Sequence, residues 1–256
     1  MPSGPATGAS SPFDPRHSVI LAREADSPIP QEALTFDGLE RLFYLARSSA
    51  GFPQWLPELT HDRRRLAAED DQEQIPAAVL LALTGNDGPS VVLTQRASHL
   101  PTHAGQVSLP GGRAEASDFS EEATALREAQ EEIGLKPDRV RLLGRLPDYV
   151  TVTGFRVTPV IGRVESDHPA FVPDRSEVAE IFSVPLAFLM NPANHQWRVV
   201  PDAERLMGRR VEFYAMPYCS PAHQGREFFI WGATAAMLRN LYRFLHAAST
   251  QSASRL

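Results

Sequence analysis

Residues 111–135 read GGRAEASDFSEEATALREAQEEIGL, and this stretch decides how the chain can fold. Its part from Glu121 to Ile133 predicts an amphipathic helix, because apolar residues recur there at helical spacing. Ser117 or Ser120 can cap the first turn, and Gly134 can adopt the left-handed conformation that ends a helix. Local sequence therefore defines both ends of this helix.

Carboxylates gather on one face of the predicted helix. At about 100° per residue, one face is apolar and the opposite face is acidic. The apolar positions are Leu126, Ala129 and Ile133, and the acidic ones are Glu121, Glu128, Glu131 and Glu132. Like charges at these spacings repel by about 0.2 to 0.5 kcal/mol per pair, so a cation should neutralise them. Arg127 can reach Glu131 but cannot compensate the whole stripe. Oxygen ligands alone favour Mg²⁺ or Mn²⁺ over zinc. The alternative interpretation is an ordinary solvated acidic face.

The second half of this stretch matches a family pattern. Residues 127–135 read REAQEEIGL and fit R-E-U-x-E-E-x-G-U, where U is aliphatic, at every specified position. This pattern is the second half of the Nudix box, and Gly111-Gly112 supplies its glycine start, so the chain resembles the Nudix hydrolases. The first half departs from the pattern, because Asp118 stands where the box has glutamate and its interval to Arg127 is one residue longer.

The resemblance continues on both sides of the box. Residues 93–100 read LTQRASHL and residues 103–112 read HAGQVSLPGG, which is similar to the motif of the coenzyme A pyrophosphatase group of Nudix hydrolases. That group usually has arginine where Pro101 stands and an aromatic residue where Leu109 stands. Segments downstream resemble the group as well, so the resemblance covers roughly residues 75–245.

The resemblance implies a fold and a catalytic centre. The implied fold is an α/β/α sandwich with a mixed β-sheet, and the implied cofactor is Mg²⁺ or Mn²⁺ held against a pyrophosphate. Glu128 and Glu132 are the implied direct metal ligands, with Glu131 as a third or water-bridged one. Glu131, Arg127 and Glu177 form the expected catalytic set, in which Arg127 orients the acidic stripe. Glu177 is expected to be an additional ligand or the general base; the alternative is a surface glutamate.

Substrate-binding residues are expected in the upstream motif and at the start of the box. They are Arg96, His103, Gly105, Gln106, Gly111 and Gly112. An arginine can bind a phosphate through two hydrogen bonds, and glycine lets the backbone approach a phosphate closely. The alternatives are that Arg96 is an ordinary surface arginine and that the glycines only form turns.

The reaction expected from the resemblance is hydrolysis of coenzyme A or its derivatives to 3′,5′-ADP and 4′-phosphopantetheine or an acyl derivative. One alternative is hydrolysis of ADP-ribose or another nucleoside diphosphate derivative. The other is a non-catalytic Nudix module that binds nucleotides. The intact Glu128, Glu131 and Glu132 argue against that module, because without catalysis nothing would retain carboxylates that repel one another.

Composition excludes several other classes of protein. The 256 residues are 43% hydrophobic and 22% charged, as in a globular chain. Lys136 is the sole lysine and lies outside any Gly-Lys-Ser/Thr sequence, which rules out a P-loop nucleotidase. A net charge of −6 gives no field that would attract nucleic acid or an anionic membrane. We expect a small-molecule substrate, no nucleic acid or membrane partner, and a homodimer as the candidate assembly. The single cysteine, Cys219, favours a reducing cytoplasm.

The chain divides into four expected parts. Residues 1–33 lack periodicity and predict a disordered tail, and residues 34–69 predict a helical lead-in segment. Residues 70–250 are expected to form the Nudix domain, followed by a disordered C-terminus at 251–256. Within the domain we expect strands at 77–83, 91–94, 140–146, 151–164, 197–200 and 228–230, and helices at 121–133, 184–190 and 233–246.

Overall fold

The computed structural model describes residues 13–48, 74–85, 88–165 and 170–253. Its helices are α1 (Phe36–Ser48), α3 (Glu121–Ile133), α4 (Leu186–Leu189), α5 (Ala203–Met207) and α6 (Gly232–Ala253). Its strands are β1 (Val19–Arg23), β2 (Ile75–Thr84), β3 (Ser90–Arg96), β4 (Val107–Ser108), β5 (Gly111–Arg113), β6 (Val140–Arg145), β7 (Tyr149–Val150), β8 (Phe155–Val164), β9 (Val178–Pro185), β10 (Gln196–Val199), β11 (Glu212–Ser220) and β12 (Arg226–Trp231).

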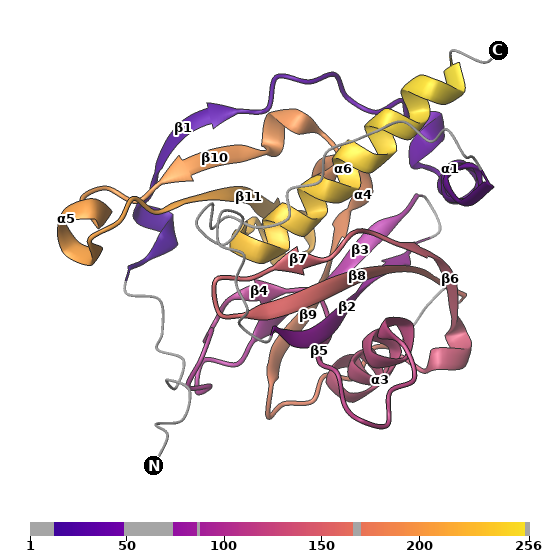
Figure 1. Ribbon diagram of the computed structural model, residues 1–256, viewed down its shortest axis with the longest axis horizontal. Coiled ribbons are helices and arrows are strands. Elements are labelled where there is room, and N and C mark those ends of the chain that lie inside the picture. Colours follow the sequence, from indigo (N-terminus) through magenta and orange to yellow (C-terminus); the bar gives the residue numbers. More distant parts are fainter. Residues whose placement is uncertain (1–12, 49–73, 86–87, 166–169, 254–256) are drawn as a thin grey trace.

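The strands form two sheets. The large sheet has the order β4-β3-β2-β8-β6, with β5 paired to β2, β7 to β8 and β9 to β3. The pairing of β2 with β8 is parallel, whereas β2 pairs with β3 in the antiparallel direction. A parallel pair requires a crossover, and the chain between β2 and β8 contains α3. Figure 1 shows α3 on one side of this sheet and α6 on the other. The mixed α/β/α sandwich is therefore confirmed.

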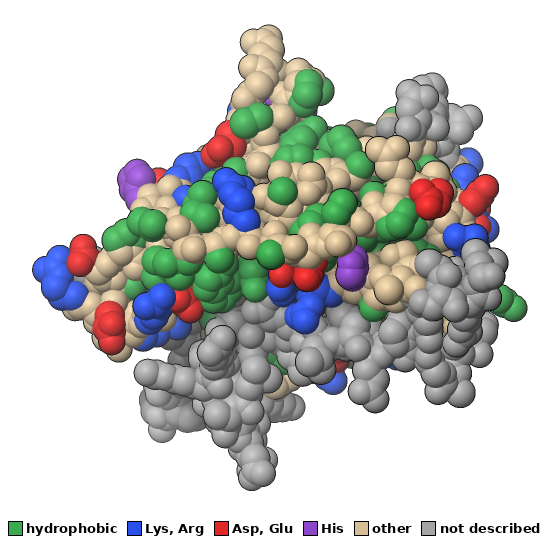
Figure 2. All heavy atoms as spheres, turned by 90° about the horizontal axis from the view of Figure 1, so that it is seen from above, with side chains coloured by type: hydrophobic (Ala, Val, Ile, Leu, Met, Phe, Trp, Pro, Cys, Tyr) green, Lys and Arg blue, Asp and Glu red, His purple; other side chains and the backbone are tan. Residues whose placement is uncertain are grey.

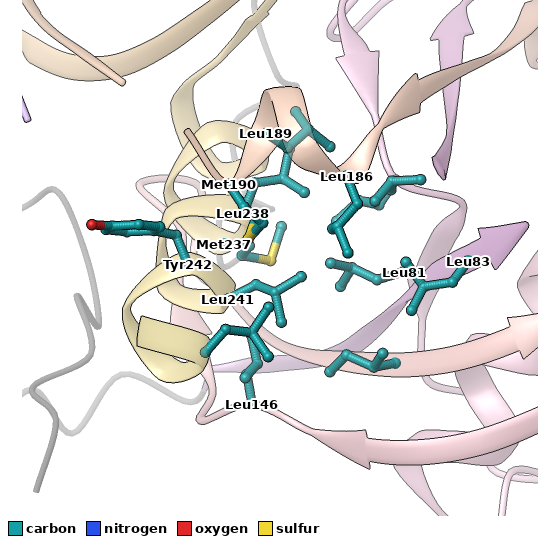
Figure 3. Packing of buried hydrophobic residues seen from close by; sticks show 14 of the residues in the cluster. Leu81, Leu83, Leu146, Leu186, Leu189, Met190, Met237, Leu238, Leu241 and Tyr242 are labelled. Carbon is teal, nitrogen blue, oxygen red and sulfur yellow. The ribbon is translucent and has the colours of Figure 1, made fainter. Parts of the chain in front are cut away.

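Strand β2 shows why helices cover both faces of the large sheet. Side chains alternate between the two faces of a strand. Ala78 and Leu80 pack with Ala129 of α3, while Leu81 packs in the larger cluster on the opposite face. In Figure 3, Leu241 of α6 lies close to Leu81 within that larger cluster. The continuous apolar run of β2 thus reflects burial on both sides.

The smaller sheet has the order β1-β10-β11-β12 and incorporates the N-terminal part of the chain. Strand β1 pairs with β10, Ile29 and Leu34 are buried in the main core, and Glu24 forms an ion pair with Arg239 of α6 at 2.5 Å. The prediction of a disordered tail over residues 1–33 is therefore wrong for residues 13–33. Their partners lie more than a hundred residues away, so local periodicity could not reveal them.

The lead-in segment also belongs to the main core. The expected helical segment contains α1, whose Leu39, Leu42 and Phe43 are buried. The ring of Phe43 lies 4.7 Å from that of Phe244 in α6. The part of the lead-in segment beyond residue 48 lies outside the described residues. The segment at 34–48 is thus packed against the sandwich, because α1 has an apolar stripe that the sheet and α6 bury.

A pair of isoleucine substitutions tests this N-terminal packing. Ile29 is 5% exposed and Ile20 is 40% exposed. We expect Ile29→Ala to lower the free energy of unfolding by about 2–4 kcal/mol, because it leaves a cavity. The matched Ile20→Ala should cost much less, because its side chain already contacts water. Chemical denaturation of both variants measures this, and equal small effects would mean that residues 13–33 do not pack on the domain.

Two further predictions differ from the structure. A helix was expected at 184–190, but β9 runs to Pro185 and α4 spans only Leu186–Leu189, because residues 178–185 pair along β3. The C-terminus was expected to be disordered from residue 251. The structure instead continues α6 to Ala253, seven residues beyond the predicted end of this helix at residue 246. Residues 254–256 lie outside the described part.

The described surface carries charges of both signs. Figure 2 views the molecule from above and shows acidic and basic side chains interspersed with hydrophobic ones. That face therefore has no single-signed field that would draw in a polyanion. Among the described residues, no helix is long and apolar enough to cross a membrane.

Candidate active site

Helix α3 begins and ends where local sequence predicts. Of the two candidate caps, Ser120 is the one used, and its hydroxyl oxygen accepts a hydrogen bond from the backbone N–H of Ala123 at 3.2 Å. Gly134 has φ 68° and its N–H bonds to carbonyl oxygens of the last turn. This left-handed conformation is costly for residues with a Cβ atom. Both ends of the acidic helix are thereby fixed.

Strand β5 brings Gly111 and Gly112 directly against the acidic side of α3. The backbone N–H of Gly111 donates to Oε2 of Glu132 at 3.3 Å. A Cβ atom on Gly112 would lie 2.6 Å from the carboxylate of Glu128, closer than any normal contact. Any side chain at position 112 would therefore displace the Glu128 carboxylate from its present position.

Glu132 does not lie on a solvated face of α3, although helical periodicity placed it on the acidic side opposite the apolar residues. It is 5% exposed, whereas the side chain of Glu131 is 58% exposed. Glu132 lies next to Ile133 and within about 60° of Ala129 around the helix, so it sits at the edge of the packed face. Burial raises the pKa of Glu132 to about 7, and repulsion from Glu128 and Glu177 adds to the rise.

The carboxylate of Glu128 is in a similar environment. Burial is the main cause that raises its pKa, and repulsion from Glu131 and Glu177 acts in the same direction, while Arg127 opposes the rise. One buried and one partly buried carboxylate thus face Gly111 and Gly112, and their charged forms are disfavoured without further positive charge.

Arg127 ties the helix to the loop before it. Its guanidinium binds Asp118 through two hydrogen bonds of 3.1 and 3.0 Å, and its Nη1 lies 3.1 Å from Glu128 and 2.9 Å from Glu131. The hydrogen bonds from Arg127 lower the pKa of Asp118 to about 2. The predicted reach from Arg127 to Glu131 is confirmed, and Arg127 holds both carboxylates in place.

Asp118 is a residue whose role the sequence did not reveal. Besides its bonds to Arg127, its Oδ2 accepts from the backbone N–H of Glu115 at 2.9 Å and from the hydroxyl of Thr124 at 3.0 Å. The signal was its place six residues after Gly112, but the extra residue before Arg127 obscured it. The structure shows that Asp118 still reaches Arg127, although its side chain is shorter than that of glutamate and the interval is one residue longer.

Arg96 reaches the same carboxylates from strand β3. Its Nη1 lies 3.9 Å from Oε1 of Glu132, and its positive charge counteracts the rise in the pKa of that group. The Nε atom of Arg96 is buried and has no hydrogen-bond partner among the described residues. Arg96 is therefore partly buried beside Glu132, unlike an ordinary surface arginine.

The predicted substrate residues His103, Gly105 and Gln106 share one turn after β3. The side chains of His103 and Gln106 contact each other at 3.0 Å. Backbone hydrogen bonds join Arg96 to both Gln106, at 2.9 Å, and Gly105, at 3.2 Å. The structure thus connects this turn to Arg96, and through it to Glu132.

Glu177 lies on an exposed turn beside the same region. Its carbonyl oxygen accepts from the N–H of Ala97 at 2.7 Å, and the neighbouring Ser176 carbonyl contacts the ring of His99 at 3.0 Å. Its charge raises the pKa of both Glu128 and Glu132, which places it within electrostatic range of them. The turn is positioned by the residues that follow Arg96.

The donor set suits a hard divalent cation. Glu128, Glu131 and Glu132 offer oxygen atoms alone, and the absence of a side chain at Gly112 gives the Glu128 carboxylate the space that it occupies. Within the described residues, no three acidic, histidine or cysteine side chains lie close enough together to form a ready-made metal site. Arg127 and Arg96 hold the carboxylates instead. The residues fit a divalent cation in the chemistry of their donor atoms.

Comparisons with known proteins identify relatives of this chain. A family model described as NUDIX domain matches residues 74–203. The chain is 41% identical over 172 residues to a protein of Pectobacterium atrosepticum named "Uncharacterized Nudix hydrolase NudL", with 66% of this chain and 82% of that protein covered. A protein of the same name from Escherichia coli is 38% identical, with 64% and 80% covered. The crystal structure of the Nudix hydrolase RenU from M. smegmatis matches 53% of this chain and 84% of its own, at 25% identity and a TM-score of 0.39.

Proposed function

The chain belongs to the Nudix hydrolase family, and from this premise we propose that it hydrolyses the pyrophosphate bond of coenzyme A and its derivatives. The products are 3′,5′-ADP and 4′-phosphopantetheine or an acyl form of it. Nudix hydrolases act on small molecules and generally use divalent metal ions. Mg²⁺ or Mn²⁺ is the proposed cofactor here, because the donor atoms are carboxylate oxygens.

The observation that carries this proposal is the arrangement of Gly112, Glu128, Glu132 and Arg96. Two carboxylates that face a glycine backbone can hold a cation, and the guanidinium of Arg96, whose side chain is 24% exposed, can donate to a phosphate beside it. A bound divalent cation supplies neutralisation of phosphate charge and activation of water. The other contributions come from protein side chains.

Each side chain has a proposed role. Glu128 and Glu132 are the direct metal ligands, and Glu131, which is more exposed, is the third or water-bridged one. Arg127 fixes Glu128 and Glu131 through its hydrogen bonds, while Asp118 holds Arg127. Glu177 is proposed as an additional ligand or the general base, because it lies in range of both buried carboxylates.

The substrate assignment depends on the turn that carries His103, Gly105 and Gln106. Two positions depart from the coenzyme A motif, and they differ in their surroundings. Leu109 is 2% exposed and packs in the main core, so a leucine at this position affects packing and not the exposed surface of the turn. Pro101 is exposed on the turn itself and can alter which substrates fit. The single free cysteine, Cys219, supports the proposed cytoplasmic location. A homodimer stays a prediction.

A product-resolved screen tests the substrate. With Mg²⁺ or Mn²⁺, coenzyme A should be hydrolysed with a higher kcat/KM than ADP-ribose, NADH or diadenosine polyphosphates. If ADP-ribose is preferred by tenfold or more, the coenzyme A assignment is wrong and the alternative holds. Such a reversal requires about 1.4 kcal/mol of differential transition-state binding, so Pro101 would be the first position to examine. Absence of hydrolysis of every diphosphate would favour the non-catalytic module.

A further inference from the structure

Residues 97–106, which we call the substrate loop, connect β3 to β4 and carry His103, Gly105 and Gln106. Besides its backbone bonds to Arg96, the loop is held by a side chain of β3. The amide Nε2 of Gln95 donates to the carbonyl oxygen of Gly105 at 3.2 Å. This hydrogen bond fixes the position of the Gly105 carbonyl group. The conformation of the loop therefore depends on the orientation of the Gln95 side chain.

Gln95 is oriented by Arg226, which comes from the other sheet. Nη2 of Arg226 donates to Oε1 of Gln95, which leaves the amide nitrogen free to face Gly105. Nη1 of Arg226 donates to Oε2 of Glu180 at 2.7 Å, and Glu180 stands opposite Gln95 in the pairing of β3 with β9. Both ends of the Gln95 amide are therefore engaged, and one amide orientation satisfies both.

Aromatic rings fix the guanidinium of Arg226. It lies over the ring of Phe228 at 4.7 Å, and that ring stacks on Phe182 of β9 with centroids 3.7 Å apart. His223 contacts the edge of Phe228 at 5.2 Å and lies 3.1 Å from Oε1 of Glu180. Stacking and the paired carboxylate together hold the guanidinium in a single direction, toward Gln95.

Residues that follow the matched Nudix residues 74–203 also contact the chain directly after the substrate loop. The hydroxyl of Thr234, at the start of α6, donates to the carbonyl oxygen of Val107 in β4 at 3.1 Å. Strand β12 also lies against β4. The C-terminal segment from β12 to α6 thus contacts the residues on both sides of the substrate loop, Gln95 and Val107.

We propose that Arg226 is a positioning residue for substrate binding, acting through Gln95 on the substrate loop. This inference rests on the proposed function of that loop. Arg226 sets the direction of the Gln95 amide, the amide holds the carbonyl of Gly105, and the turn then presents His103 and Gln106. Among the described residues, Arg226 forms no hydrogen bond or ion pair with Glu128, Glu132 or Arg127. The strength of substrate binding therefore depends on a strand outside the matched domain.

Two substitutions test this chain of contacts. Arg226→Gln removes the guanidinium, and Gln95→Glu keeps an acceptor for Arg226 but turns the donor toward Gly105 into a carboxylate oxygen. In both variants KM should rise by about tenfold, while kcat stays within about twofold, because the metal-binding carboxylates are untouched. Arg210→Gln is the control, because Arg210 forms an exposed ion pair with Glu212 on the same sheet and should leave KM unchanged.

Hydrogen exchange without substrate separates this proposal from the proposed function. The amides of Gly105 and Gln106 should exchange at least tenfold faster in Arg226→Gln and Gln95→Glu than in the control. This readout does not depend on which diphosphate is the substrate, and the kinetic comparison uses whichever one the screen selects. Unchanged exchange and KM in both variants would overturn the proposal, as would a fall in kcat at constant KM. Circular dichroism confirms folding, and Gln95→Glu retains the test if Arg226→Gln unfolds.

Discussion

Replacing Glu132 by glutamine is expected to lower kcat for pyrophosphate hydrolysis by about 10²- to 10³-fold at saturating Mg²⁺. A metal ion contributes several kcal/mol to stabilising the transition state, and each 1.36 kcal/mol corresponds to a factor of ten. Glu132 is 5% exposed and faces Glu128, so the neutral amide should leave the metal-free protein as stable as the wild type or slightly more stable. Steady-state kinetics and metal-free thermal melts measure the two effects.

Glu122→Gln is the matched control for this prediction. Glu122 lies in the first turn of the same helix, outside the acidic stripe. Its replacement should leave kcat within about twofold and cost at most about 1 kcal/mol through the lost interaction with the helix dipole. If Glu132→Gln keeps wild-type activity, the acidic helix is an ordinary helix with a buried glutamate, and the metal assignment fails.

Replacing Arg127 by methionine should reduce both stability and activity. The Asp118 side chain is 7% exposed and would keep its hydrogen bonds from Glu115 and Thr124 but lose its counter-charge, which costs about 1.5–3 kcal/mol. Activity should fall by about 10- to 100-fold, because Glu128 and Glu131 lose the guanidinium that orients them. Arg145→Met is the control, since Arg145 forms an exposed ion pair with Glu121 of the same helix and should cost less than about 1 kcal/mol.

The pH dependence of stability identifies Asp118 as the partner. Its pKa is lowered from 3.8 to about 2 in the folded protein, so its contribution is fully present above about pH 4 and is lost as the pH falls toward 2. Asp118→Asn should therefore show a smaller loss of unfolding free energy than the wild type between pH 4 and pH 2. The double variant with Arg127→Met should be more stable than the sum of the single effects. Strict additivity would mean that the two side chains are not coupled.

Features whose signals are local in the sequence were predicted correctly. Helix α3, its cap at Ser120 and its end at Gly134 follow from neighbouring residues, and the reach from Arg127 to Glu131 follows from helical geometry. The mixed sandwich followed from the family resemblance. These features need no knowledge of distant parts of the chain.

Features that depend on distant partners were missed. Strand β1 forms because β10 accepts it, across more than 170 residues, and the composition of residues 13–33 gives no sign of this. Burial of Glu132 depends on the approach of Gly111, which helical periodicity alone cannot show. The contact between Arg226 and Gln95 joins residues 131 positions apart that share no motif. Such contacts come from tertiary packing.

Direct titration of Mn²⁺, followed by electron paramagnetic resonance without substrate, tests most directly the claim that the carboxylates of α3 hold a divalent cation. The wild type and Glu122→Gln should bind Mn²⁺ with the same Kd. Glu132→Gln should bind it at least tenfold more weakly, because one of two direct carboxylate ligands is gone. An unchanged Kd in Glu132→Gln would contradict the account and place the cation elsewhere.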